Sequence, residues 1–276
     1  MKARGFLIFA QGSEHFQQAY LAALSLKASH NKYPVSVVTD CESNAKYDEV
    51  FDEVLDIPWQ TQDETEFKTQ NRWKLYHVTP YSETIVLDSD VLVLQNLEYF
   101  WNLLGSYDLF FPTSVFTYRR ELVTTDFYRR AFIANNLPNL YNAVHYFRKS
   151  DFALEFYKWV ETVNNNWQLF YGNFCKEYYP QQPSMDITTA IVAKILNCET
   201  SITSSRQSMP ELVHMKPRAQ HWRQLKTSWQ EVVGTYLTPE LQLKIGNHVQ
   251  DTIFHYTENN FVTEDVIRKY EKCLNL

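Results

Sequence analysis

Two aspartates interrupt an otherwise apolar stretch of the chain, IVLDSDVLVL at residues 85–94. Valine, isoleucine and leucine on both sides of Asp88 and Asp90 predict buried β-structure. A buried carboxylate without a partner is strongly destabilising, so it finds a counter-charge or becomes protonated. The fold must therefore supply a partner for these carboxylates or shift their pKa values.

The spacing of the two aspartates favours one shared cation. On an extended backbone residues two apart project to the same side, so Asp88 and Asp90 can face one point while Ser89 faces away. Hard divalent ions such as Mg²⁺ or Mn²⁺ take carboxylate oxygens together with substrate phosphates. The triplet predicts a metal site, and the alternative is a solvated turn, because D-x-D also arises by chance in chains of this length.

Composition limits the classes of protein that fit. The chain has 276 residues, of which 45% are hydrophobic, enough for a large core. No linker, repeat or shift in composition divides it, so we predict one domain at 1–276. The net charge of -6 argues against nucleic acid as a partner.

Membrane and secretory signals are not found in the sequence. No stretch approaches the roughly 20 apolar residues that a membrane span needs. The four cysteines are scattered without C-x-x-C spacing, which fits a reducing setting. We therefore expect a cytoplasmic protein.

Strand and helix patterns alternate along the chain, which predicts an α/β fold with a mixed, mostly parallel central sheet flanked by helices. In such sheets ligands bind outside the carboxyl ends of the strands. Gln11, Asp40 and Asp88 follow three of the predicted strands and should converge there. Strands are expected at 5–10, 33–40, 53–57, 84–87, 107–112, 142–148 and 252–256, and helices from an N-cap at Ser13, at 71–81, 151–164 and 185–196, with a polar loop at 60–70.

The segment NRWKLYHVTPYSETIVLDSDVLVLQNLEYFW (residues 71–101) resembles the metal-site region of glycogenin-like retaining glycosyltransferases. The resemblance implies a single domain of the GT-A (Rossmann-like) fold, with a nucleotide-binding half at about 1–105 and an acceptor-binding half at about 106–276. It also implies Mn²⁺ or Mg²⁺ as cofactor, UDP-glucose or UDP-galactose as donor, an acceptor of unknown identity, and transfer of a hexose with retention of anomeric configuration.

The same resemblance assigns roles to individual residues. Lys74, on the helix before the metal strand, would neutralise a phosphate oxygen or bind the donor sugar, with a surface lysine as the alternative. Ser89, between the two metal ligands, would contact the donor. The residues implied for the uridine pocket are Ala10, Gln11, Gly12, Thr39 and Asp40.

A late histidine completes the metal site in enzymes of this family, and the chain offers two. His255 in TIFHYTENNF is favoured over His214 in ELVHMKPRAQHW, and a core histidine is the alternative for each. The family's Gly and Lys-Pro-Trp after the histidine are missing here. The lysine that contacts the diphosphate would then come from elsewhere, and Lys216 is one possibility.

Two further segments match the family in part. LYNAVHYFRKSD resembles the strand that faces the donor sugar and matches at Asn142 and Ala143. SMDITTA matches only at Asp186, with Ile187 in place of a glutamine. Loss of that amide favours a front-face reaction or moves nucleophilic duty to Asp186. Asp186 as a helix cap is the structural alternative.

Two other functions compete with glycosyl transfer. IVLDSDVL approximates the nucleophile strand of haloacid-dehalogenase-like phosphatases, although that motif belongs on the first strand and needs a later acidic pair. A non-catalytic nucleotide-sugar-binding protein is the third possibility, since fold alone does not fix function.

Overall fold

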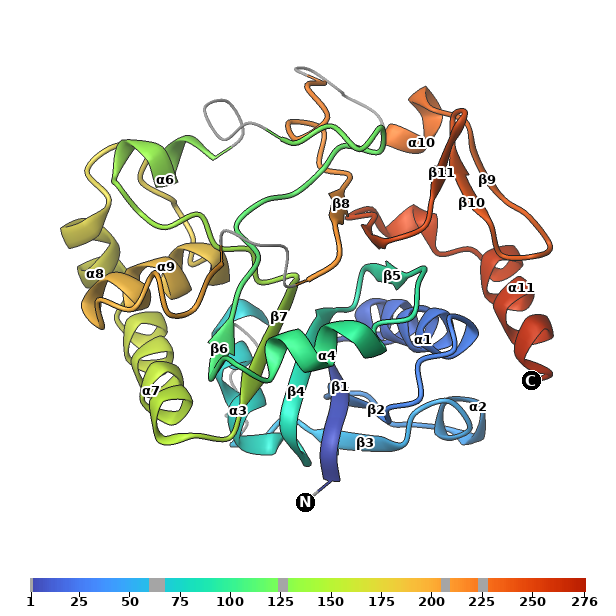
Figure 1. Cartoon of the computed structure of the whole chain (residues 1–276), viewed down its shortest axis with the longest axis horizontal. Coiled ribbons are helices and arrows are strands. Elements are labelled where there is room, and N and C mark those ends of the chain that lie inside the picture. Colours follow the sequence, from blue (N-terminus) through green and yellow to red (C-terminus); the bar gives the residue numbers. More distant parts are fainter. Residues whose placement is uncertain (1, 60–67, 124–128, 205–208, 223–227) are drawn as a thin grey trace.

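A computed structural model describes residues 2–59, 68–123, 129–204, 209–222 and 228–276. A six-stranded sheet forms its centre (Figure 1), and the α/β prediction is confirmed. Four strands run parallel, and the last two are antiparallel to their neighbours. Across the sheet the strands are β3 (Glu53–Asp56), β2 (Val35–Thr39), β1 (Lys2–Ala10), β4 (Tyr81–Asp88), β7 (Val144–Arg148) and β6 (Leu109–Phe110).

Helices cover both faces of the sheet because its central strands are apolar on both sides. Along β1, Phe6 and Ile8 pack into one core, whereas Leu7 and Phe9 pack into the other. The first core contains α1 (Ser13–Ala28) and α4 (Glu98–Leu104), and the second contains α7 (Asp151–Asn165) and α9 (Met185–Ile195).

Two small three-stranded sheets extend this framework. One has the order β5 (Val91–Val93), β12 (Ile253–His255), β8 (Leu212–His214), and the other has the order β11 (His248–Gln250), β10 (Leu243–Ile245), β9 (Thr235–Leu237). The remaining elements are α2 (Ala45–Asp48), η1 (Lys68–Lys74), α3 (Leu75–Val78), α6 (Arg130–Ala134), α8 (Trp167–Phe174), α10 (Trp229–Val232), η2 (Asn259–Phe261) and α11 (Glu264–Leu274).

The helix expected at 71–81 differs from the prediction. The segment forms the 3₁₀-helix η1 and one turn of α3, which ends at Val78. Thr79 is extended because the following Pro80 disfavours helical backbone. Strand β4 then begins at Tyr81, three residues before its predicted start.

The predicted N-cap is also displaced. Gly12 caps α1 with φ 86°, and no side chain caps that helix. Only glycine adopts this backbone readily, which is why Ser13 becomes the first helical residue. Of the loop expected at 60–70, residues 60–67 lie outside the described part, and the two predicted halves stay a prediction.

Across the described ranges, every helix is too short or too polar to traverse a bilayer.

Candidate functional site

The polar residues of the predicted site meet at one edge of the central sheet. Strands β1, β2 and β4 are parallel, so Ala10, Thr39 and Asp88 end at the same edge. The antiparallel β7 begins there, and the amide of Asp88 donates to the carbonyl of Ala143 at 2.8 Å. Residues distant in the sequence therefore border a common crevice.

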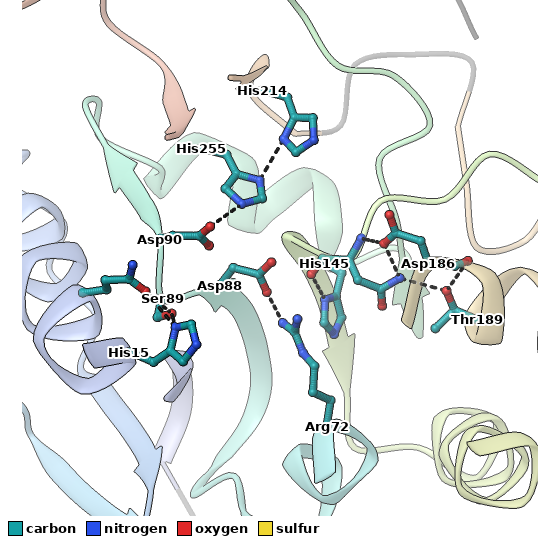
Figure 2. A network of polar contacts seen from close by, with 12 residues as sticks. His15, Arg72, Asp88, Ser89, Asp90, His145, Asp186, Thr189, His214 and His255 are labelled. Carbon is teal, nitrogen blue, oxygen red and sulfur yellow. Dashed lines mark hydrogen bonds and ion pairs between the residues drawn. The ribbon is translucent and has the colours of Figure 1, made fainter. Parts of the chain in front are cut away.

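Three of the predicted metal ligands lie together. One ligand atom each from Asp88, Asp90 and His255 falls within 4.8 Å of the others. His255 Nε2 lies 2.9 Å from Asp90 Oδ2, and Figure 2 shows the ring and both carboxylates facing one another. Burial would raise the pKa of Asp90, but the interaction with His255 outweighs it and lowers the pKa. The structure thus gathers the donor set that the sequence predicted.

Strand register explains why His255 reaches Asp90. In the small sheet, His255 pairs with Val91 of β5 and with His214 of β8. The amide of Tyr256 donates to the carbonyl of Asp90 at 3.2 Å, which fixes the end of β12 beside the acidic turn. Both histidines end their strands in register, so they share one face.

The other candidate, His214, lies behind His255. Their Nδ1 atoms are 2.9 Å apart, so one ring must donate to the other. Burial, and then the charge of His255, lower the pKa of His214 well below its usual value. A neutral His214 accepts the hydrogen bond when His255 donates from Nδ1, and Nε2 of His255 is the nitrogen that faces Asp90. This is the usual arrangement behind a metal-binding imidazole.

A small cavity of about 150 Å³ opens beside the carboxylates. Arg72 from η1 lines it and forms an ion pair with Asp88. Phe9, Gln11, His15 and the predicted Ser89 also line it, and Ser89 Oγ donates to Gln18 at 3.2 Å. Sequence reasoning missed Arg72, although the planar guanidinium of arginine is the better bidentate partner for a carboxylate.

Lys74, which was predicted to contact a phosphate oxygen or the donor sugar, does not line the carboxylate cavity. Its side chain is buried, and Nζ donates to the carbonyl of Trp59 at 3.2 Å. It lines a different pocket, and Arg72 from the preceding turn takes the position beside Asp88. The prediction assumed a regular α-helix here, whereas the backbone is a 3₁₀-helix. A 3₁₀-helix has three residues per turn instead of 3.6, so each side chain points in a different direction than it would on an α-helix.

Asp186 and Asn142 form a second polar cluster, and Figure 2 shows Asp186 on the other side of Arg72 from Asp88. Asp186 Oδ1 accepts from the Asn142 amide at 2.9 Å and from its Nδ2 at 3.1 Å, and Oδ2 accepts from Arg129 at 2.9 Å. Burial would raise the pKa of Asp186, but Arg129 and the Asn142 amide lower it. Asp186 lies in the first turn of α9 after Ser184, so it is not the N-cap.

Arg129 is a buried residue that the sequence did not single out. It also donates to the carbonyl of Leu140 at 2.6 Å, and its guanidinium lies 3.8 Å from the ring centre of Phe132 and 4.0 Å from that of Tyr141. The two rings and two hydrogen bonds fix its orientation. Asp186 is therefore held at both oxygens.

A buried histidine lies between the two clusters. His145 Nδ1 lies 3.0 Å from the carbonyl of Asn142, and Nε2 lies 3.0 Å from Tyr157 Oη. Burial, and then the charge of Arg72, lower the pKa of His145 to about 3. It is neutral at physiological pH and supports the loop that carries Asn142.

The residues predicted for a uridine pocket divide into two groups. Ala10 and Thr39 are buried beneath the strand ends. Gly12 donates its amide to Asp40 Oδ1 at 2.7 Å, and Gln11 Oε1 accepts from Asn71 at 3.3 Å. Gln11 and Gly12 form the partly exposed β1–α1 turn, and the exposed Asp40 follows β2.

The remaining predicted donor contact, Lys216, is exposed. Its charge lowers the pKa of both Asp90 and Asp186, after the larger effects described above. Lys216 is therefore a positive charge close enough to the crevice to stabilise the ionised forms of both Asp90 and Asp186.

Comparison with solved structures identifies the architecture. The galactosyltransferase LgtC, solved in complex with donor and acceptor sugar analogues, matches with a TM-score of 0.56 and 12% identity over 99% of this chain and 96% of its own. The chain has the GT-A fold. An active-site mutant of LgtC matches with a TM-score of 0.54 and 13% identity over 98% and 95% of the two chains.

Other comparisons define the limits of this likeness. The glycosyltransferase GlyE of Streptococcus pneumoniae matches over 75% of this chain but only 46% of its own, with a TM-score of 0.49 and 13% identity. No family model and no curated protein matches the sequence. At these identities the likeness establishes the fold, and function must be argued from the site.

Proposed function

We propose that this protein is a metal-dependent glycosyltransferase that moves a hexose from a UDP-sugar to an acceptor with retention of configuration. The observation that carries the proposal is the convergence of Asp88, Asp90 and His255 at the strand ends of a GT-A fold. The fold is one that known glycosyltransferases have, and these three side chains could hold the divalent ion that the proposed reaction uses.

The donor set fits a divalent cation. Two carboxylates and an imidazole are ligands that Mn²⁺ and Mg²⁺ accept, with the imidazole favouring Mn²⁺. The carboxylates are negatively charged neighbours, and Arg72 neutralises only Asp88. When bound, the ion would supply Lewis-acid stabilisation of the charge that develops on the departing diphosphate.

The chain's own residues divide the remaining work. Arg72 and Lys216 are cations beside the crevice and are placed to hold phosphate oxygens. Gln11, Gly12 and Asp40 lie at the strand ends where a nucleoside binds in open α/β sheets. The cavity of about 150 Å³ is smaller than a whole donor, so it would hold the phosphate portion.

The Asp186 cluster is suited to binding sugar hydroxyls. Asp186 is held ionised by Arg129, and an ionised carboxylate accepts hydrogen bonds from hydroxyl groups. Its oxygens already accept three N–H groups, which reduces their nucleophilicity. We therefore favour front-face transfer, in which the acceptor oxygen bonds to the anomeric carbon, the bond to the diphosphate breaks, and a diphosphate oxygen takes the acceptor's proton.

A binding experiment tests the metal and the nucleotide together. UDP binding, measured by calorimetry, should strengthen sharply when Mn²⁺ is added, and Asp90→Ala should remove that gain. Equal UDP affinity with and without Mn²⁺ would contradict the proposed site.

A turnover experiment tests the reaction. Incubation with Mn²⁺ and either UDP-glucose or UDP-galactose should release UDP, slowly to water and faster when an acceptor is present. Binding of UDP without any release would instead identify a non-catalytic nucleotide-sugar-binding protein. Release of inorganic phosphate from simple monoesters would favour the phosphatase, although the GT-A fold removes the structural support for that alternative.

A further inference from the structure

A second, larger pocket borders η1, the 3₁₀-helix that also carries Arg72 to the carboxylate cavity. Its volume is about 530 Å³, and none of its lining residues lines the carboxylate cavity. The loop after β3, the η1–α3 segment and helix α7 contribute to it. The lining residues are Trp59, Trp73, Lys74, His77, Lys158, Glu161 and Asn165.

One wall of this pocket is aromatic. Trp59 and Trp73 stack with ring centres 5.7 Å apart and an interplanar angle of 13°, and the ring of His77 meets Trp59 edge-on at 5.4 Å. Trp59 is 62% exposed, which is unfavourable for an indole unless something covers it. An aromatic wall that is open to solvent is suited to an apolar ligand surface.

The backbone around Trp59 is held in an uncommon conformation. Its φ of 51° lies in the left-handed region, which bulky residues rarely adopt. Lys74, only 4% exposed, donates from Nζ to the carbonyl of Trp59 and lies 5.9 Å from the ring centre of Trp73. The fold therefore uses a buried charged side chain to hold an exposed indole in place.

The opposite wall is polar. Lys158, Glu161 and Asn165 lie three and four residues apart on α7, so they share one face of the helix. Within the described part of the chain, none of these three side chains has a hydrogen bond or ion pair. They offer an ammonium, a carboxylate and an amide to the pocket.

His77 adds a further acceptor. Burial, and then the charges of Lys149 and Lys158, lower its pKa, so the ring is neutral at physiological pH. A neutral imidazole has one donor and one acceptor nitrogen.

These two walls match the two surfaces of a pyranose ring. One face of a pyranose carries C–H groups, which pack on the electron-rich face of an indole, and its rim carries hydroxyls, which bond to carboxylates, amides and amines. A nucleotide base could also stack there, but its phosphates would meet Glu161. We infer that the Trp59–Trp73 pocket is a carbohydrate-binding site distinct from the carboxylate cavity.

The position of the pocket suggests its use. Arg72 reaches the carboxylate cavity, and the adjacent Trp73 and Lys74 line the carbohydrate pocket, so one short helix serves both. A remote unit of an acceptor glycan would be held here. This use rests on the proposed function, whereas carbohydrate binding itself does not.

Fluorine NMR on the full chain labelled with 5-fluorotryptophan tests the inference. The chain has seven tryptophans, and the spectra of Trp59→Phe and Trp73→Phe assign the two signals of interest. The probes are methyl β-glucopyranoside, lactose, maltotriose and chitotriose. At least one should shift the Trp59 and Trp73 signals saturably and leave the other five unchanged.

Variants separate this site from the proposed active site. Trp59→Ala should weaken binding of the responding saccharide by at least about tenfold, the equivalent of one stacking contact. Glu161→Gln, at a partly exposed helical position that tolerates the change, should weaken it by a smaller factor. Asp90→Ala should leave saccharide binding intact while it abolishes the effect of Mn²⁺ on UDP binding.

Three results would overturn the inference. One is the absence of any shift at Trp59 with all four saccharides at concentrations of tens of millimolar. Another is a shift confined to other tryptophans, and the third is a response of Trp59 to UDP but to no saccharide. Each is independent of whether UDP binding depends on Mn²⁺, so failure of the one proposal is distinguishable from failure of the other.

Discussion

The crevice has aspartates on two sides, and the partners that balance their negative charge differ between the sides. Asp88 and Asp90 face each other with a histidine, and one arginine pairs with Asp88 alone. Asp186, in contrast, is enclosed by a buried arginine and the N–H groups of Asn142. The first side places two carboxylates beside one paired arginine and an imidazole that can bind a metal, so it is suited to gaining a cation. The second is already neutralised, so it is suited to binding uncharged groups.

The largest expected effect concerns metal affinity. Asp90→Ala should lower the affinity for Mn²⁺ by at least about 100-fold, since loss of a direct ligand should exceed the 10–100-fold typical of supporting residues. Asp186→Asn, the matched control on the other side, should change it less than about threefold because Asp186 already has its partners. Calorimetric titration with Mn²⁺ measures both, and equal losses would show that the two sides do not differ.

The next effect concerns folding stability. Arg129→Met should lower the free energy of unfolding by about 3 kcal/mol, because it leaves Asp186 partly buried without its counter-charge. Urea unfolding at pH 7 measures the loss, and added Mn²⁺ should not reduce it. An unchanged urea midpoint would mean that Asp186 does not depend on Arg129.

Arg72→Met provides the contrast on the metal side. It removes the partner of Asp88, but Mn²⁺ supplies a replacement charge and stabilises the folded state that binds it. The loss of stability should therefore largely disappear when Mn²⁺ is added. If Mn²⁺ stabilised Arg129→Met just as much, the contrast between the two sides would fail.

The smallest effect concerns pH. The pKa of His145 is about 3 in the folded protein and near 6.5 unfolded, so the unfolded chain binds more protons between these values. Stability contributed by this group is present above pH 6.5 and is lost as pH falls. From pH 7 to pH 5 it should contribute about 2 kcal/mol of destabilisation.

His145→Gln isolates this contribution. His214, whose pKa is also lowered, acts in the same pH range, so the test is the difference between wild type and variant. Urea unfolding of both proteins at pH 7 and pH 5 should show a smaller loss for the variant. Parallel losses would mean that His145 is protonated without penalty.

The sequence predicted the metal-site strand and its neighbours well because these elements are marked by strong local signals. Apolar runs that end in Gln11, Asp40 and Asp88 predict buried parallel strands, and all three end at one edge of the sheet. The pairing of Asp88 with Asp90 depends only on strand periodicity. Such features need no knowledge of distant contacts.

The sequence could not choose among residues whose position depends on tertiary contacts. Arg72 and Lys74 lie two residues apart, and the 3₁₀-helix sends one to Asp88 and the other to Trp59. Arg129 reaches Asp186 across a long stretch of chain. The sequence did contain a signal that His214 lies beside His255. Two apolar residues precede the histidine in both LVH and IFH, and these two strands pair in register.

The positions of the three proposed metal ligands in the chain also have a consequence for when the site could form during synthesis. Asp88 and Asp90 lie on β4 and the turn after it, whereas His255 is contributed by one of the last strands of the chain. A nascent chain that has completed the first parallel strands can display the two carboxylates but not the imidazole. Capture of an ion by all three side chains would therefore have to wait until His255 has been synthesised, 165 residues after Asp90.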